Sequence, residues 1–210
     1  MTIRLIAGLG NPGARYERTR HNVGMAWLHR LAGRFHLPLS PERKFHGSVA
    51  RGDILGRDVW LLAPDTYMNL SGDAVGPLAH FYKLAPEEIL IAYDEVAFEP
   101  GACRLRVGGG HNGHNGIRSV IAALGNQAGF ARLRIGVGHP GNTGEMIAYL
   151  TGTRMMADEQ SRVEQATDFD DDTLRRLLHG DFDAAMNAIN ARRRLPQASE
   201  CEAPADPGQR

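Results

Sequence analysis

The sequence predicts an α/β domain whose largely parallel or mixed sheet is covered by helices on both faces. Short apolar runs typical of strands alternate along the chain with segments in which apolar residues recur at helical spacing. The chain has 210 residues, of which 42% are hydrophobic and 23% are charged, so it is long enough for one substantial core. We find no internal repeat and no dividing linker, and we expect a single domain over residues 1–195. Residues 196–210, rich in Pro, Ala and charge, are predicted to form a disordered tail.

Six segments carry the apolar pattern of strands, and the second of them carries it most weakly. They are residues 3–7, 47–51, 59–63, 89–93, 102–107 and 133–137. Helices are expected after Asn22, which is predicted as an N-cap, after Ser71, and along the apolar stripe of residues 117–124. Residues 157–195 have a helical pattern, with Asp181 as the predicted cap of the last helix.

Composition argues against several classes of protein. No stretch approaches 18 consecutive apolar residues, so a membrane span is not expected. The first residues enter a strand-like run without the pattern of a secretory signal. Cys103 and Cys201 form neither a disulfide framework nor a metal-binding spacing. We therefore expect a cytoplasmic protein with no membrane contact.

The net charge is zero, but the charges are divided unevenly along the chain. Residues 1–157 hold 17 Lys and Arg against 12 Asp and Glu, a net of +5, and residues 158–210 hold 7 against 12, a net of −5. The basic excess lies in the part that carries the unusual motifs, so a local electropositive face for nucleic acid is possible. Uneven solubilising charge would give the same numbers, and charge by itself favours that plainer interpretation.

Gly8, Gly10 and Gly13 satisfy the G-x-G-x-x-G spacing of a dinucleotide-binding turn. Such a turn must lead directly into a helix whose N-terminal amides hold the pyrophosphate. Here residues 14–21 have no apolar helical face, and no acidic residue ends a second strand about 20 positions further on. The nucleotide interpretation fails, and the motif is interpreted as a rigid loop that presents Asn11.

Polar side chains gather where predicted strands end, which is where open α/β sheets place their functional sites. Asn11 follows the first strand, residues 66–69 follow the strand at 59–63, Asp94 ends the strand at 89–93, and the glycine-rich residues 108–116 follow the strand at 102–107. The chain has no G-x-S-x-G nucleophile elbow.

A histidine acting on water, supported by a carboxylate, remains the best-suited chemistry, with His21 and Asp94 as the pair. Amides of Asn11, Asn69 and Asn115 could surround a substrate carbonyl, and this apparatus suits an activated ester better than an amide. Each residue also has a plainer interpretation, because histidine is often a structural hydrogen-bonder and Asp or Asn often serves caps and turns.

Two histidines of the glycine-rich segment raise a separate question. His111 and His114 have an i,i+3 spacing that could bind a metal, but no Cys or acidic ligand stands beside them in the sequence. In a glycine-rich loop we expect them to be hydrogen-bonding or substrate-facing groups, and a metal site stays a minor alternative.

Five ordered blocks together are far more specific than any one of them. They are GLGNPG at 8–13 followed by Tyr16, TRHNVG at 19–24, YMNLSG at 67–72, Asp94 followed by GGHNGHNG at 109–116, and RLRIGVGHPG at 132–141. In this order and spacing, over roughly residues 3–190, the chain resembles the bacterial peptidyl-tRNA hydrolase family.

The resemblance implies a role for each matched position. His21 corresponds to the family's catalytic base, Asp94 to the carboxylate that stabilises it, and Asn11 to the residue that distinguishes N-blocked from free aminoacyl-tRNA. Four further positions correspond to substrate contacts: Tyr16, Tyr67, Asn69 and Asn115. Two correspond to residues that line the cleft, Met68 and His114. Three correspond to basic positions that bind tRNA phosphates, Arg104, Arg106 and Arg134.

The same resemblance implies a three-layer α/β/α domain with a twisted mixed sheet, an ester hydrolase acting on peptidyl-tRNA, a monomer, and no metal or cofactor. Arg104 and Arg106 stand where relatives often carry Lys, and Asn112 is bulkier than the residue of some members, so phosphate contacts and loop shape are expected to differ. The competing hypothesis is an RNA-binding protein on the same scaffold without hydrolysis.

Overall fold

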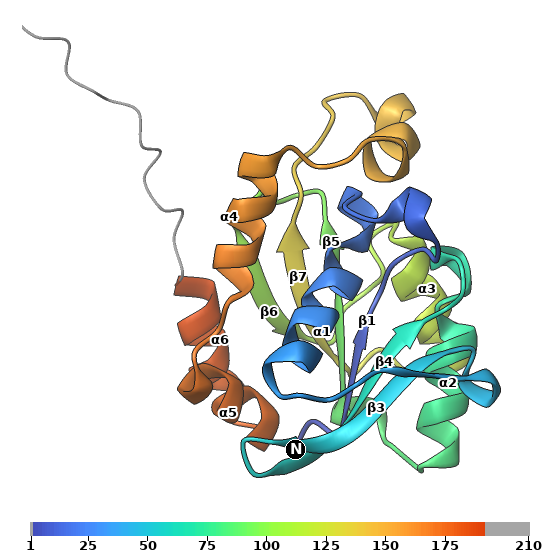
Figure 1. Ribbon diagram of the computed structural model, residues 1–210, viewed down its shortest axis with the longest axis vertical. Coiled ribbons are helices and arrows are strands. Elements are labelled where there is room, and N and C mark those ends of the chain that lie inside the picture. The colour runs from blue at the N-terminus through green and yellow to red at the C-terminus, as the bar shows by residue number, and fades with distance from the viewer. Residues whose placement is uncertain (1, 192–210) are drawn as a thin grey trace, which may run out of the picture.

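The computed structural model describes residues 2–191, which form one seven-stranded mixed sheet between two layers of helices (Figure 1). The strand order is β2-β3-β4-β1-β5-β7-β6, with β4, β1, β5 and β7 parallel and the pairs β2–β3, β3–β4 and β6–β7 antiparallel. The strands are β1 Leu5–Gly8, β2 Ser40–Glu42, β3 Gly47–Ile54, β4 Arg57–Pro64, β5 Ile89–Glu95, β6 Cys103–Val107 and β7 Ala131–Gly136.

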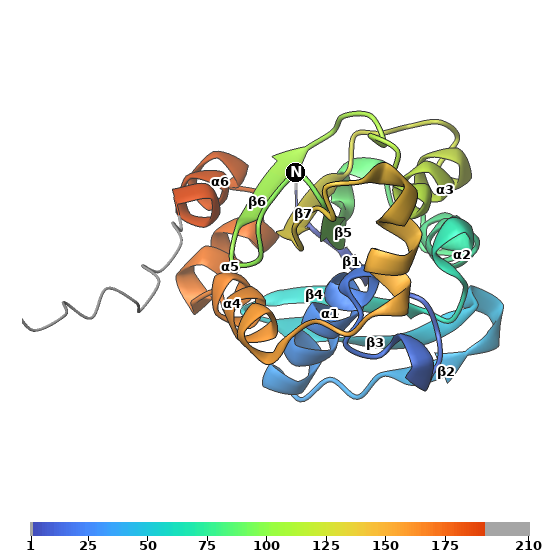
Figure 2. The ribbon, with the colours of Figure 1, turned by 90° about the horizontal axis from the view of Figure 1, so that it is seen from above.

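Helices cover both faces of the sheet, as Figures 1 and 2 show. One layer contains α1 Val23–Arg34, α4 Ala157–Thr167, α5 Asp171–His179 and α6 Phe182–Ala191, and the other contains α2 Gly72–Phe81 and α3 Asn115–Ala123. The central strand β5 is buried on both faces: Leu90 and Ala92 belong to the core under α1, and Ile91 and Tyr93 to the core under α2 and α3. The period-2 geometry of a strand produces this division.

The predicted α/β class, with both faces covered, is confirmed, and so are all six predicted strands. The weak segment at 47–51 is part of β3, which extends to Ile54 and pairs with β4 across a hairpin. The short strand β2 was not predicted because it holds only three residues, includes Pro41 and has no alternation of buried and exposed positions. The predicted tail, residues 196–210, and residues 192–195 lie outside the described residues.

The predicted caps had different outcomes. Asp181 is a cap, since its carboxylate accepts from the Ala184 main-chain N–H at 3.3 Å. Asn22 precedes α1 but does not cap it. Its side chain instead bridges the main chain of Asn11, accepting from the N–H at 2.8 Å and donating to the carbonyl at 2.9 Å. The Asn22 cap prediction is therefore wrong, because a tertiary partner satisfies the amide better than the helix does.

The chain enters the glycine-rich segment at the end of the sheet opposite to the one expected, where β7 begins and not where the parallel strands end. Because β6 runs antiparallel to β7, its carboxyl end pairs with the start of β7, as the partnership of Val107 with Ala131 shows. The chain then returns along the sheet, and Gly108 and Gly109 turn there with φ of 69° and 105°, which glycine adopts without strain. The buried Arg132 of β7 donates to the carbonyls of Gly109 and Gly110 and holds this return path.

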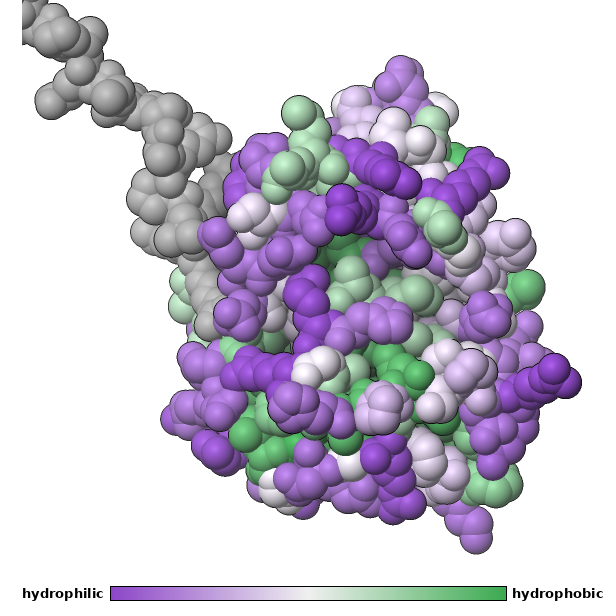
Figure 3. All heavy atoms as spheres, in the orientation of Figure 1, coloured by the Kyte–Doolittle hydropathy of each residue, from purple (hydrophilic) through white to green (hydrophobic). Residues whose placement is uncertain are grey.

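Within residues 2–191, no helix has the length and apolar character needed to cross a membrane. Figure 3 shows the α1 face as largely hydrophilic, with apolar side chains gathered in patches between the polar ones.

The outer edge of β6 is closed by one side chain of α6. Asn190 accepts from the Leu105 main-chain N–H at 2.8 Å and donates to the Leu105 carbonyl at 3.3 Å. The amide thereby takes the place of a neighbouring strand at an edge that would otherwise be unpaired. This contact fixes α6 against the sheet.

We expect Asn190→Ala to lower the free energy of unfolding by about 1–3 kcal/mol, because it leaves main-chain groups of Leu105 without partners. Urea unfolding followed by circular dichroism measures the change. Asn187→Ala, on the exposed side of the same helix, is the matched control. Equal stabilities of the two variants would show that the Asn190 amide does not hold the edge.

Candidate active site

The carboxyl ends of the parallel strands β1, β4 and β5 meet at one edge of the sheet, where the chain encloses a cleft of about 580 Å³. The loop after β1 brings Asn11 to it, the turn after β4 brings Met68, and β5 ends in Asp94. A single 3-10 turn, Arg20–Asn22, places His21 at the N-terminal end of α1. Eight of the nine predicted catalytic and substrate-binding residues line this cleft: Asn11, His21, Tyr67, Met68, Asn69, Asp94, His114 and Asn115.

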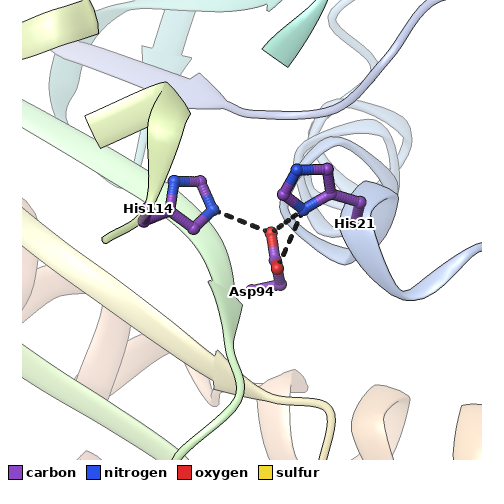
Figure 4. Close-up of side chains that lie close together, drawn as sticks. All are labelled: His21, Asp94 and His114. Carbon is purple, nitrogen blue, oxygen red and sulfur yellow. Dashed lines mark hydrogen bonds and ion pairs between the residues drawn. The ribbon is translucent and has the colours of Figure 1, made fainter. Parts of the chain in front are cut away.

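His21 and Asp94 form the pair that the sequence predicted (Figure 4). The Nδ1 atom of His21 lies 2.9 Å from both carboxylate oxygens, so the carboxylate fixes the tautomer in which Nδ1 carries the proton. The other ring nitrogen, Nε2, makes no hydrogen bond within the described chain, and the His21 side chain retains 13% exposure. His21 is thus arranged as a base with its lone pair free.

A second imidazole completes the site. His114 is the N-cap of α3, and its Nδ1 accepts from the Ile117 N–H at 3.2 Å. Its Nε2 therefore carries the proton in the neutral ring and donates to the Oδ1 of Asp94 at 3.0 Å. Tyr93 packs edge-on against the His114 ring. His114 thus reaches the site as a donor to Asp94 (Figure 4).

The contacts within the site shift the pKa values of His21 and Asp94. Burial by itself lowers the pKa of His21, but the charge of Asp94 and its hydrogen bond outweigh burial and raise this pKa above its ordinary value of 6.5. Burial likewise raises the pKa of Asp94, yet the two imidazoles hold it well below its usual range. Asp94 therefore stays ionised at neutral pH while His21 titrates.

His21, Asp94 and His114 also bring three possible metal-ligand atoms within 4.8 Å of one another. Histidine ligands in metal sites normally use the second ring nitrogen as a donor. His114 does the reverse, since its Nδ1 accepts from the Ile117 main chain. The donor pattern fits a proton-holding network better than a cation site.

Asn11 is fixed at the floor of the cleft. Its Oδ1 accepts from the Met68 main-chain N–H at 2.7 Å, and Asn22 holds its main chain. The Nδ2 group makes no hydrogen bond within residues 2–191, so Asn11 offers a donor to the cleft. Because the Met68 N–H occupies the side-chain oxygen, the donor end of the carboxamide is the one left free.

The other polar groups of the cleft are more exposed. Asn69 and Asn115 stand at its mouth, and the Oδ1 of Asn115 accepts from Arg118 at 3.2 Å. Tyr67 is 55% exposed. Tyr16 does not line the cleft but meets the Tyr67 ring edge-on, with ring centres 6.4 Å apart. The two tyrosines together form an aromatic rim.

The predicted phosphate contacts stand on β6 and β7, and none of them lines the cleft. Arg104 and Arg106 stand opposite Arg134 and Arg132. Arg134 forms an ion pair with Glu95 at 2.7 Å, and Arg104 donates to main-chain carbonyls of β6 and α6. Arg106 is exposed and makes no hydrogen bond or ion pair within residues 2–191. Of the predicted contacts, Arg106 is the one whose guanidinium is fully available to a ligand.

Sequence reasoning missed one wall of the cleft, which Met146, Ile147, Leu150 and Thr151 form. These residues lie in a π-helical segment and the turn before it, between β7 and α4. The segment is too short for its apolar residues to establish a helical period, so the sequence pattern did not single it out. Asn22, the brace of Asn11, was misassigned as a cap.

A family model described as peptidyl-tRNA hydrolase matches residues 5–197. The chain belongs to the peptidyl-tRNA hydrolase family. The peptidyl-tRNA hydrolase of Shewanella denitrificans is 47% identical over 189 residues, covering 90% of this chain and 96% of the relative. That of Pseudomonas syringae pv. syringae is 47% identical over 191 residues, covering 91% and 98%.

Solved structures of the family have the same fold. The crystal structure of peptidyl-tRNA hydrolase from Acinetobacter baumannii is 45% identical and superposes with a TM-score of 0.87, covering 91% of this chain and 96% of that one. A second structure, a complex with N-propanol, is 44% identical with a TM-score of 0.88. The twisted mixed sheet expected from the resemblance is therefore confirmed.

We expect the pKa of His21, followed by its ring proton signals in NMR, to lie above 6.5 and to fall below 6.5 in Asp94→Asn. The substitution removes the charge that raises the pKa and leaves the burial that lowers it. Asp73→Asn, at an exposed position of α2, is the control and should leave the titration unchanged. An unshifted pKa in Asp94→Asn would contradict the electrostatic coupling.

Proposed function

We propose that this chain cleaves peptidyl-tRNA at the ester between the peptide's carbonyl carbon and the 3′-terminal ribose, and so recycles tRNA from peptidyl-tRNAs that leave or stall in translation. The observation that carries the proposal is the His21–Asp94 pair with Nε2 of His21 free beside an open cleft. Membership of the family supports the substrate class.

His21 acts as general base in the first step. Its Nε2 takes a proton from water as the water oxygen attacks the ester carbon, and the imidazolium formed is stabilised by Asp94 at 2.9 Å. Negative charge then develops on the former carbonyl oxygen. Asn11, Asn69 and Asn115 line the cleft, and we propose that their side-chain N–H groups donate to this oxygen.

The second step reverses the proton transfer. The bond from carbon to the ribose oxygen breaks, and the His21 imidazolium returns its proton to that oxygen, giving a free peptide carboxyl group and a tRNA hydroxyl. An alkoxide leaves an ester with less help than an amine leaves an amide, so this pair suffices without a nucleophilic side chain. Asp94 and His114 keep the His21 ring oriented throughout.

The N-acyl group next to the ester would be recognised by residues at the floor and rim of the cleft. The Nδ2 group of Asn11 can donate to the carbonyl of an N-acyl group, which a free aminoacyl ester lacks. Met68, Tyr67 and Tyr16 would pack against the peptide. We propose these contacts as the basis for selecting N-blocked substrates.

The tRNA would be held by its phosphates rather than by its bases. Arg104, Arg106 and Arg134 lie on one pair of neighbouring strands, which suits sequence-independent backbone contacts. We further propose that the protein acts as a monomer in the cytoplasm, where translation takes place, without a metal or cofactor and without membrane contact.

His21→Ala should reduce kcat for an N-acetylated aminoacyl-tRNA by about 10²–10⁴-fold, because the general base is lost. Affinity for deacylated tRNA should be unchanged. Release of the acyl group is measured with the blocked and the unblocked substrate, the latter testing selectivity. Tight tRNA binding without cleavage by the wild-type protein would instead identify an RNA-binding protein.

Arg106→Ala should weaken tRNA binding and reduce the slope of log K against log salt by about 1, because one phosphate contact is lost. Arg57→Ala, on β4 away from the proposed surface, is the control. Binding is measured by fluorescence anisotropy over a range of salt concentrations. An unchanged slope would place Arg106 away from phosphate.

A further inference from the structure

The wall formed by residues 146–151 is joined to the sheet by two contacts: the Tyr149 hydroxyl donates to the Val137 carbonyl at 2.7 Å, and Leu150 packs against the core. Ile147 is 80% exposed, although it lines the cleft. Figure 2 shows this golden segment beside the blue turn at the N-terminal end of α1, and Figure 1 shows the same neighbours near the top of the molecule. The contacts between this wall and the turn that carries His21 therefore determine the shape of the cleft.

The strongest link between the two is Arg20, the residue before His21. Its side chain is only 8% exposed. One guanidinium nitrogen lies 2.6 Å from the Glu159 carboxylate of α4, and another donates to Thr153 at 3.2 Å. The guanidinium carbon lies 4.1 Å from the centre of the Tyr149 ring. One cation thus contacts Tyr149 within the wall and both Thr153 and Glu159 beyond it.

Main-chain contacts reinforce this link. The Met155 N–H donates to the Arg18 carbonyl at 2.9 Å, and Thr19 pairs with Arg154 in an antiparallel bridge. Glu159 also accepts from the Met156 N–H at 3.0 Å, so the carboxylate that binds Arg20 also closes the first turn of α4. Residues 149–156 and the turn before His21 therefore form one connected unit.

We propose that Arg20 is a positioning residue that fixes the wall at 146–151 relative to His21. Arg20 and His21 share one turn of 3-10 helix, so the contacts that anchor Arg20 also anchor the main chain that carries His21. A buried ion pair contributes little net stability compared with apolar replacements of the same size, while it demands one geometry. The ester would then be held between a wall and a base whose separation Arg20 sets.

The inference rests on the proposed hydrolysis and adds a residue that does not touch the substrate. Arg20 does not line the cleft. Its effect should therefore appear in the rate of the chemical step and not in the binding of tRNA, because the proposed phosphate contacts lie on β6 and β7. A purely structural Arg20 would change stability and leave turnover of the folded enzyme intact.

The test uses Arg20→Met, Glu159→Gln and the double variant Arg20→Met/Glu159→Gln. Glutamine at 159 keeps an oxygen that can accept from Met156, so the start of α4 is preserved. The double variant has no unpaired buried charge and guards against a failure of either single variant to fold. Asp158→Asn, which breaks an exposed pair with Arg162 on the same helix, is the matched control.

We expect kcat for N-acetylated aminoacyl-tRNA to fall about tenfold in Arg20→Met and in the double variant, since small misplacements of reacting groups cost rate steeply. The KM should stay within about twofold, and the losses should be non-additive because the two residues act as one unit. The midpoint temperature of thermal unfolding, measured in parallel, should return towards the wild-type value in the double variant, while kcat should stay low.

A double variant with wild-type kcat, or a loss no larger than that of Asp158→Asn, would overturn the proposal. So would a change confined to KM. Inactivity of the wild-type protein would count against the proposed hydrolysis itself, and an active wild type with unaffected variants would count against the role of Arg20 alone. The two failures are therefore distinguishable.

Discussion

The carboxylate of Asp94, 2% exposed and shared between two imidazoles, is the constraint on which the site depends. A buried carboxylate is costly unless every oxygen finds a donor. His21 supplies one from the α1 side of the sheet, and His114 supplies another from the α3 side. The charge of Asp94 in turn keeps Nδ1 of His21 protonated and Nε2 free. The two helix layers are thus joined at the catalytic edge through one residue of the central strand.

Close packing of α1 on the sheet makes this meeting possible. A Cβ atom on Gly24, in the first turn of α1, would clash with the carbonyl oxygen of Ala92, two residues before Asp94. A Cβ on Gly8 of β1 would clash with the main chain of Gly24. With no side chains at these positions, the helix approaches close enough for His21 to reach Asp94. Gly8 and Gly10 of the first motif therefore serve close contact with the α1 region, while Gly13 turns the chain with a φ of 96°.

The uneven charge along the sequence becomes a division between structural elements. The basic excess includes the paired arginines of β6 and β7, and the acidic excess includes the C-terminal helices, with exposed residues such as Asp158, Asp171 and Asp172. A zero net charge thus conceals regions of opposite sign. This arrangement is consistent with a polyanionic substrate that is attracted to one part of the surface and repelled from another.

The sequence by itself determined the α/β class, six of the seven strands, the His21–Asp94 pair and most of the cleft, because strand patterns are local and the five motifs come in a specific order. The tertiary structure decided what depends on pairing between distant segments. It set β6 antiparallel to β7, so that the glycine-rich chain returns along the sheet. It also placed the Asn22 side chain against the main chain of Asn11 and not at the start of α1. It also brought residues 146–151 over the cleft, because the contacts that place this segment join residues far apart in the sequence. Local sequence patterns determine the helices and strands. The partner of a side chain that could form several hydrogen bonds is decided only by which groups the folded chain brings near it.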